Sequence, residues 1–141
     1  MTSEADIVAL ARRFFDAAEA GDIETLRGCY APNAIIWHNT DDLEQSRDEN
    51  SRTLEAFVQR ISDRVYAVRR LHIFDGGFVQ QHELRGKRAD GVAVRLTACV
   101  ICAVDDGRIT RLDEYFDSAQ VAAFRATAHG LDATNLELRK S

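Results

Sequence analysis

Residues 108–116 read Arg-Ile-Thr-Arg-Leu-Asp-Glu-Tyr-Phe and follow the turn dipeptide Asp106-Gly107. β-Branched and aromatic residues after such a turn predict a strand that pairs with the segment before it. Side chains alternate between the two faces of a strand, and one face is expected to hold Thr110, Leu112, Glu114 and Phe116. A carboxylate between two large apolar neighbours is poorly hydrated and can exchange protons near neutral pH. The alternative is a hydrated strand-end carboxylate, or one paired with an arginine.

Three more stretches lead up to this strand, and short glycine-bearing loops separate them. The stretches are Val65–Phe74, Phe78–Arg85 and Val92–Val104. Loops this short join antiparallel neighbours, so the second half of the chain predicts a four-stranded meander. Every even position from Val92 to Val104 is apolar, which indicates that one face of this sheet lies on a core.

The first half of the chain has helical periodicity. Helices are predicted from Ser3 to Gly21, from Asp22 to Gly28, and from Ser46 to Ile61, each beginning at a residue that can cap the helix. Between the second and third, Tyr30–Asn33 is predicted as a turn because Pro32 fixes its own backbone. A short strand, Ala34–His38, follows.

These elements predict an α+β fold in which three N-terminal helices pack on one face of a curved, mainly antiparallel sheet and enclose a cone. A last short helix is expected over Gln120–Ala128, ending at Gly130. We therefore predict a single domain over residues 1–130 and a C-terminal tail over residues 131–141.

Composition narrows the class of protein. The 141 residues are 45% hydrophobic and 29% charged, which suits one globular domain. The net charge of -5 argues against a nucleic-acid partner. The sequence has neither an apolar run long enough to span a membrane nor a signal segment, so we expect a cytoplasmic protein with no membrane partner. Its cysteines, Cys29, Cys99 and Cys102, lack metal-ligand spacing and are expected to be reduced.

Three local motifs carry a resemblance to a known family. They are Phe14-Phe15-Asp16-Ala17-Ala18-Glu19-Ala20-Gly21-Asp22, then Tyr30-Ala31-Pro32-Asn33-Ala34 leading to Trp37-His38-Asn39, and Asp106-Gly107-Arg108-Ile109 leading to Asp113-Glu114-Tyr115-Phe116-Asp117. Over roughly Ile7 to Phe124 the chain resembles the nuclear transport factor 2-like superfamily, which includes ketosteroid isomerases, limonene epoxide hydrolases and SnoaL-like polyketide cyclases. The resemblance implies a ligand pocket inside the cone and a dimer formed through the exposed sheet face.

The resemblance also implies roles for single residues. The steroid isomerases place their base at the position of His38, but their oxyanion-binding tyrosine and aspartic acid match Phe14 and Val100. The epoxide hydrolases use an arginine and two aspartates; Glu114 matches one aspartate, and the other two positions fall on Gln80 and His82. In the polyketide cyclases an acidic residue of the last strand removes a proton next to a carbonyl, and Glu114 looks like its counterpart.

The residues themselves predict a compatible cluster. Gln80 and His82 share one face of their strand, as Ile36 and His38 do of theirs. If both faces point into the cone, two imidazoles and an amide surround Glu114, and imidazole suits proton transfer at neutral pH. His38 has an alternative role, a hydrogen bond to the loop backbone. Two imidazoles and a carboxylate could bind a metal, but no local motif supports one, so we expect no metal and no cofactor.

The leading hypothesis is a cofactor-independent cyclase or isomerase that moves a proton on an apolar carbonyl-bearing or polycyclic small molecule. Glu114 is the expected base, with His82 and His38 as acids or hydrogen-bond donors. The expected substrate-binding residues are Gln80, Phe14, Phe57, Leu96, Val100, Leu112 and Phe116. The alternatives are a non-catalytic ligand-binding or dimerisation module of the same fold, and an epoxide hydrolase-like enzyme.

The outer sheet face suggests a partner. It is expected to carry Trp37, Arg95, Thr97, Cys99 and Ile101, a mixture too apolar to be fully hydrated and too polar for a core. Such a mixture is typical of a symmetric interface, so we expect a homodimer.

Overall fold

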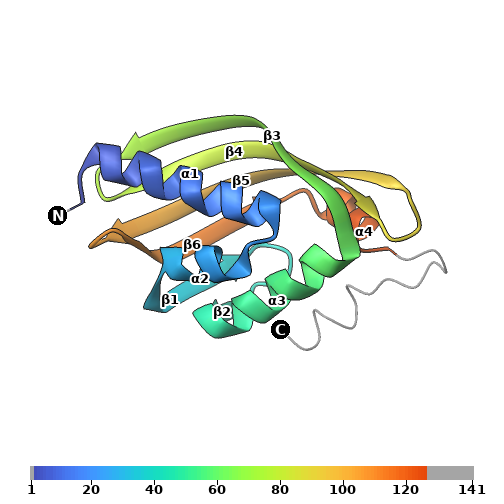
Figure 1. Cartoon of the computed structure of the whole chain (residues 1–141), viewed down its shortest axis with the longest axis horizontal. Helices are drawn as coiled ribbons and strands as arrows, with labels where there is room; N and C mark the ends of the chain where they lie inside the picture. The colour runs from blue at the N-terminus through green and yellow to red at the C-terminus, as the bar shows by residue number, and fades with distance from the viewer. Residues whose placement is uncertain (1, 127–141) are drawn as a thin grey trace.

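The computed structural model describes residues 2–126 (Figure 1). In chain order, the elements of this part are α1 (Glu4–Ala20), α2 (Ile23–Cys29), β1 (Tyr30–His38), β2 (Glu44–Ser46), α3 (Arg47–Arg60), β3 (Ile61–Phe74), β4 (Gly77–Arg88), β5 (Ala93–Asp105), β6 (Arg108–Phe116) and α4 (Ser118–Arg125). None of the described helices is long and apolar enough to cross a membrane.

The strands form one curved sheet in the order β2-β1-β6-β5-β4-β3. All neighbours are antiparallel except β1 and β6, which run parallel. Figure 1 shows α1 lying across the sheet, with α2 and α3 below it near β1 and β2. The predicted α+β architecture, helices on a mainly antiparallel sheet, is confirmed.

The core lies between the helices and the inner face of the sheet. Its larger part joins the apolar stripe of α1 to β1, β4, β5 and β6 through Phe15, Phe78 and Cys102. A smaller part packs α4 against the far ends of β3, β4 and β5 through Leu84, Leu96 and Phe124. The two clusters therefore lie at different ends of the sheet, and Tyr66 packs against both of them.

Strand β1 begins earlier than predicted. Tyr30–Asn33, expected to be a turn, is part of the strand, because Pro32 lies where the pairing with β6 is irregular. Tyr30 pairs with Ile109, and regular pairing resumes only at Ile35. Proline lacks an N–H group and is tolerated in a strand where no ladder hydrogen bond is needed. The short strand β2 was not predicted.

A bulge in β6 also corrects the predicted face of that strand. The register shifts between the pairs Ala103–Arg111 and Val104–Ile109, so β6 has an extra residue at this point. As a result Ile109, and not Thr110, is fully buried beside Leu112, while the Thr110 hydroxyl donates to the Ala103 carbonyl. A bulge of this kind reverses the alternation of faces on one side of it.

Helix α4 begins two residues before the predicted Gln120. The Asp117 carboxylate caps it by accepting hydrogen bonds from the backbone of Ala119 and Gln120. Side-chain caps of this type satisfy the free N–H groups of the first turn. The predicted end of this helix and the predicted tail lie outside the described residues.

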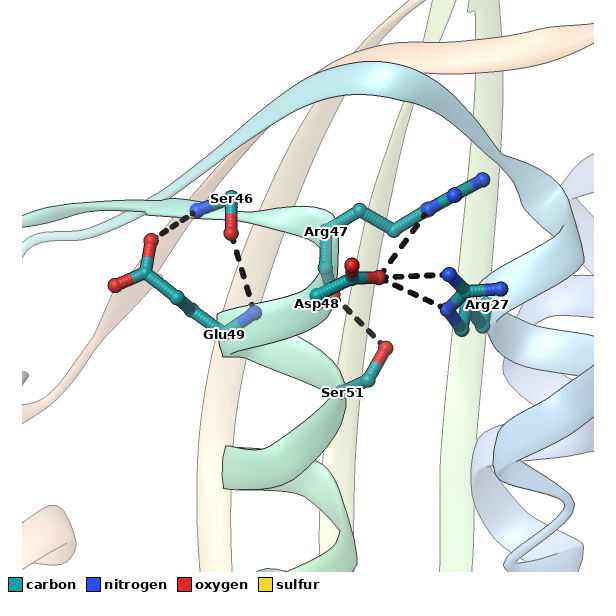
Figure 2. A network of polar contacts seen from close by, with 6 residues as sticks. All are labelled: Arg27, Ser46, Arg47, Asp48, Glu49 and Ser51. Carbon is teal, nitrogen blue, oxygen red and sulfur yellow. Dashed lines mark hydrogen bonds and ion pairs between the residues drawn. The ribbon is translucent and has the colours of Figure 1, made fainter.

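The start of α3 is held by two sets of polar contacts, which Figure 2 shows. The Glu49 N–H donates to the Ser46 hydroxyl, and the Ser46 N–H donates to the Glu49 carboxylate, which is the predicted capping box. The Asp48 carboxylate accepts from the Arg27 guanidinium at 2.8 Å and joins α3 to α2. These contacts position the first turn of α3 over β1 and β2.

We predict that Ser46→Ala lowers the free energy of unfolding by about 1 kcal/mol, because it removes the hydroxyl half of the capping box. Urea denaturation followed by circular dichroism measures this loss. Ser62→Ala, at an exposed serine of β3, is the control and should stay within about 0.5 kcal/mol of the parent. Equal stability of the two variants would contradict the prediction.

Candidate active site

The strand registers place four sequence-distant side chains in one row across the inner face of the sheet. His38 of β1 is level with Glu114 of β6. Glu114 is level with Val100 of β5, and Val100 with Gln80 of β4. His82 lies in the neighbouring row, level with Ala98 and, beyond it, Phe116. The parallel pairing of β1 with β6 thus brings the histidine of one half of the chain beside the glutamate of the other.

His38 and Glu114 are in direct contact. The Nε2 atom of His38 lies 3.2 Å from Oε1 of Glu114, and the two side chains are only 17% and 18% exposed. The His38 ring also stacks on Phe116, with 5.8 Å between ring centres and 9° between ring planes. A carboxylate and an imidazole at this distance can pass a proton between them, and the apolar ring beside them limits access of water.

Asn39 fixes the relative position of these two side chains. Its backbone N–H donates to the Glu114 carbonyl at 3.0 Å. Its side-chain amide then bonds both backbone groups of Phe116, donating at 3.1 Å and accepting at 2.9 Å. The amide continues the strand ladder beyond the end of β1, so it acts as a positioning group. Sequence reasoning missed this role, although an asparagine directly after a strand is a signal for side-chain to backbone hydrogen bonds.

The pair lies in the wall of a cavity of about 400 Å³ between the sheet, α3 and α4. This volume is in the range of small-molecule sites. The apolar part of the lining consists of Leu54, Ala56, Phe57, Leu84, Leu96, Phe116, Val121 and Phe124. The polar part consists of His38, Asp41, Gln45, Glu49, Asn50, Arg52, Thr53, Arg60, Tyr66, Glu114 and Arg125. The cavity is therefore polar near the start of α3, and on the side of α4 it combines apolar side chains with Arg125.

Tyr66 is a wall residue that sequence reasoning missed. Irregularities on both sides of Tyr66 interrupt the pairing of β3 with β4, and its backbone N–H donates to the Glu19 carboxylate of α1 at 2.8 Å. Burial, and secondly the negative charge of Glu114, raise the pKa of the Tyr66 hydroxyl. This hydroxyl therefore keeps its proton at neutral pH and can serve as a donor near Glu114.

His82 and Gln80 contact each other and do not line this cavity. The Gln80 amide lies 3.0 Å from Nδ1 of His82. The His82 ring is enclosed by Phe15 and Tyr66, at 5.2 and 4.9 Å between ring centres, and only 4% of the residue is exposed. Burial lowers the pKa of His82, and the charge of Glu114 partly opposes this shift. His82 is therefore a neutral imidazole at neutral pH.

Of the expected apolar wall, Phe57, Leu96 and Phe116 line the cavity, but Phe14, Val100 and Leu112 do not. These three are buried in the main core. Phe14 packs against Phe15 and Tyr30, with ring centres 5.0 and 5.4 Å away. Helix α1 lies directly on the sheet there, so its side chains fill the space that the sequence analysis assigned to a ligand.

No metal centre emerges from the part of the chain that the structure describes. Across residues 2–126, no three histidine, cysteine, aspartate or glutamate side chains are grouped so that they could hold a metal ion.

Comparison with solved structures defines the class. A Bacillus subtilis protein provisionally assigned as an isomerase matches with a TM-score of 0.75 at 14% identity, covering 87% of this chain and 94% of that one. A Burkholderia pseudomallei NTF2-like protein of unknown function matches with a TM-score of 0.75 at 15% identity, over 84% and 96%. At such identities the likeness shows the fold alone: this is a protein of the nuclear transport factor 2-like fold.

Within that class the chain belongs to the SnoaL-like domain family, whose model matches residues 11–112. A Shewanella putrefaciens protein provisionally assigned as a SnoaL-like polyketide cyclase is among the structural matches, with a TM-score of 0.71 at 17% identity, over 82% of this chain and 92% of that one. No functionally curated protein matches the chain in sequence.

We predict that His82 makes stability depend on pH below its ordinary pKa of 6.5. Because its folded-state pKa is lowered, the unfolded chain takes up the proton first as pH falls. The neutral His82 imidazole therefore makes its full contribution to the free energy of unfolding above pH 6.5. This contribution is lost as the pH falls from 6.5 toward the folded-state pKa. The slope cannot exceed about 1.4 kcal/mol per pH unit for one proton.

Urea denaturation of the parent and of His82→Gln between pH 5 and 7.5 measures this effect. The parent should lose stability relative to the variant as pH falls. His72→Gln, at an exposed histidine of β3, is the matched control and should follow the parent. Parallel stability curves for parent and His82→Gln would show that burial of His82 does not govern its protonation.

Proposed function

We propose that this protein is a cofactor-independent isomerase or cyclase that transfers a proton on an apolar, carbonyl-bearing small molecule. The observation that carries the proposal is the His38–Glu114 contact of 3.2 Å in the wall of a cavity with an apolar end. Family membership supports the fold, and the His38–Glu114 pair supports the chemistry.

The proposed step begins with the Glu114 carboxylate, which removes a proton from a carbon next to a carbonyl group. The electrons of that C–H bond form the carbon–carbon double bond of an enolate, and the carbonyl π electrons move to oxygen. In a substrate whose β- and γ-carbons already share a double bond, the enolate is a dienolate, and return of the proton to the γ-carbon leaves a double bond between the α- and β-carbons, which completes an isomerisation. Attack of the enolate carbon on a second carbonyl, followed by protonation of the new alkoxide, completes a cyclisation. His38 holds the carboxylate in place and can accept or return the proton.

His82 is assigned a positioning role in this proposal. It is neutral, it lies one row from Glu114 and outside the cavity lining, and its ring packs on Tyr66. By holding the Tyr66 ring at the cavity wall, it keeps a protonated hydroxyl near the carboxylate. Gln80 supports His82 through their hydrogen bond.

The apolar end of the cavity favours a flat, hydrophobic substrate. The rings of Phe57 and Phe124 are stacked with 5.7 Å between centres, and Val121 and Leu96 also line this end. Aromatic side chains gain from stacked contacts as well as from burial of apolar area. Polycyclic aromatic ketones are therefore the substrate class to test first.

The second candidate is a non-catalytic ligand-binding protein. It is favoured by the burial of Phe14 and Val100 in the core, at the positions where the steroid isomerases bind the oxyanion. A ligand-binding protein needs the cavity but does not need the His38–Glu114 pair. Loss of the carboxylate therefore separates the two candidates.

We predict that the protein catalyses exchange of the α-hydrogens of polycyclic ketones such as 2-tetralone with deuterium from solvent. Glu114→Gln and His38→Gln should slow exchange by roughly 10²- to 10⁴-fold, the usual contribution of general acid–base catalysis. Proton NMR in deuterated buffer follows the reaction directly. The His72→Gln variant is the control and should retain the parent rate.

The same ketones should raise the melting temperature of the parent and of Glu114→Gln alike, because the variant keeps the cavity. Stabilisation by ligands without any protein-dependent exchange would favour the ligand-binding candidate. An exchange rate unchanged in Glu114→Gln would remove Glu114 as the base.

We also propose that the protein is a homodimer formed through the outer face of the sheet. Trp37 and Tyr115 lie together there, with 5.2 Å between ring centres. Ile101 and Tyr115 are among the exposed large apolar side chains. Asp113 lies between Trp37 and Ile101 in the strand register, so the face mixes apolar and charged side chains, as many protein interfaces do.

Sedimentation should therefore show a species of twice the chain mass at micromolar concentration, and Ile101→Asp should convert it to single chains. A buried, unpaired charge at an interface is strongly unfavourable. Val92→Asp is the control, because Val92 is also an exposed apolar residue but lies just before β5, far along the strand from Ile101. A parent that sediments as a single chain would contradict the proposal.

A further inference from the structure

A chain of hydrogen bonds runs along the polar side of the cavity, and the chemistry proposed above does not use it. The Tyr30 hydroxyl donates to Oδ1 of Asn50 at 3.4 Å. Nδ2 of Asn50 donates to Oε1 of Gln45 at 3.1 Å, and Nε2 of Gln45 donates to the Thr53 hydroxyl at 3.1 Å. Tyr30, Asn50 and Gln45 are 1%, 2% and 7% exposed, so this is a buried polar network.

Each carboxamide in this network retains one donor. An amide has two N–H bonds, and the hydrogen bonds found among residues 2–126 use one on Asn50 and one on Gln45. Exchanging the oxygen and nitrogen positions of both side-chain amides still leaves one unused N–H on each, because Gln45 would then donate to Asn50, and Asn50 to Tyr30. A buried donor without an acceptor costs about 1–3 kcal/mol. Both amides line the cavity, so an acceptor on a ligand can satisfy them there.

These donors share the cavity with the proposed base. Gln45 pairs with Ile36, which lies two residues before His38 on the same face of β1. Asn50 belongs to the first turns of α3, so the sheet and a helix each supply one amide. Gln45, Asn50 and Glu114 all line this one cavity. A single bound molecule can therefore contact both amides and the carboxylate.

We infer that the amide N–H groups of Gln45 and Asn50 bind the carbonyl oxygen of the substrate and stabilise its negative charge in the enolate. This inference rests on the proposed function. As Glu114 takes the proton it becomes neutral, and the charge appears on the oxygen. Two preorganised neutral donors stabilise that charge without placing a cation beside the carboxylate. Phe14 and Val100, which match the oxyanion-binding positions of the steroid isomerases, have no hydrogen-bond donor in their side chains. The amides of Gln45 and Asn50 would supply those donors from the cavity lining.

The test compares 2-naphthol, a flat aromatic with an enol-like oxygen, with naphthalene, which lacks the oxygen. Ligand-observed NMR with the full chain gives both affinities. The parent should bind 2-naphthol more tightly. Asn50→Leu and Gln45→Met should each weaken 2-naphthol binding by roughly threefold to tenfold, the usual range for one hydrogen bond, and leave naphthalene binding unchanged. Gln81→Met, at an exposed glutamine of β4, is the matched control.

Asn50→Asp and Gln45→Glu provide a second set, because they keep the size of the side chain but replace the donor with an acceptor. They too should lose the preference for 2-naphthol. A preference that survives in every amide variant, or that disappears only in Glu114→Gln, would overturn the inference. Since binding of 2-naphthol needs no turnover, failure of the amide donors is distinguishable from failure of Glu114 as the base in the exchange assay.

Discussion

The parallel pairing of β1 with β6 is the interaction on which the site depends. Every other neighbouring pair in the described sheet is antiparallel and joins strands that are close in sequence or connected by a short loop. Only β1 beside β6 brings the first half of the chain against the last strand, and it puts His38 level with Glu114. Asn39 secures that end of the pairing with hydrogen bonds to Glu114 and Phe116.

The cavity exists because the helices cover the sheet unevenly. Helix α1 packs directly on the sheet through Phe14 and Phe15, which leaves no space beneath it. Helices α3 and α4 cover the other end, and side chains of both helices and of the sheet line the cavity there. A polar group that becomes buried without a hydrogen-bond partner costs free energy. Each polar group of the cavity lining therefore favours ligands that offer it a partner.

The polar groups of the cavity form two sets with different properties. His38 and Glu114 are an imidazole and a carboxylate in direct contact, whereas Tyr66 and the Tyr30–Asn50–Gln45 network consist of groups that keep their protons and donate hydrogen bonds. Enolate chemistry requires a base that removes the proton and hydrogen-bond donors that stabilise the negative charge on the enolate oxygen. The capping box at the start of α3 holds the backbone next to both amides, because Ser46 directly follows Gln45 and Glu49 directly precedes Asn50.

The elements of the fold were predictable from the sequence because they depend on neighbours in the chain. Helical periodicity, capping boxes and glycine turns located the helices and the meander, and with the family motifs they predicted the class. Glu114 and His38 stood out because each lies on an apolar strand face. Two local exceptions escaped this reasoning: the strand that includes Pro32, and the bulge that moves Thr110 off the inner face. Both depend on how a partner strand is aligned.

Tertiary structure alone decided which residues meet. Phe14, Val100 and Leu112 have the same apolar character as Phe57 and Leu96, yet the first three lie in the larger core cluster away from the cavity, whereas the last two line the cavity. Tyr66, Gln45 and Asn50 carry no local signal, since a tyrosine in a strand or an amide near a helix start is ordinary. Their roles arise from which helices and strands surround the cavity, and non-local packing of the whole chain decides this, so no single stretch of sequence encodes it.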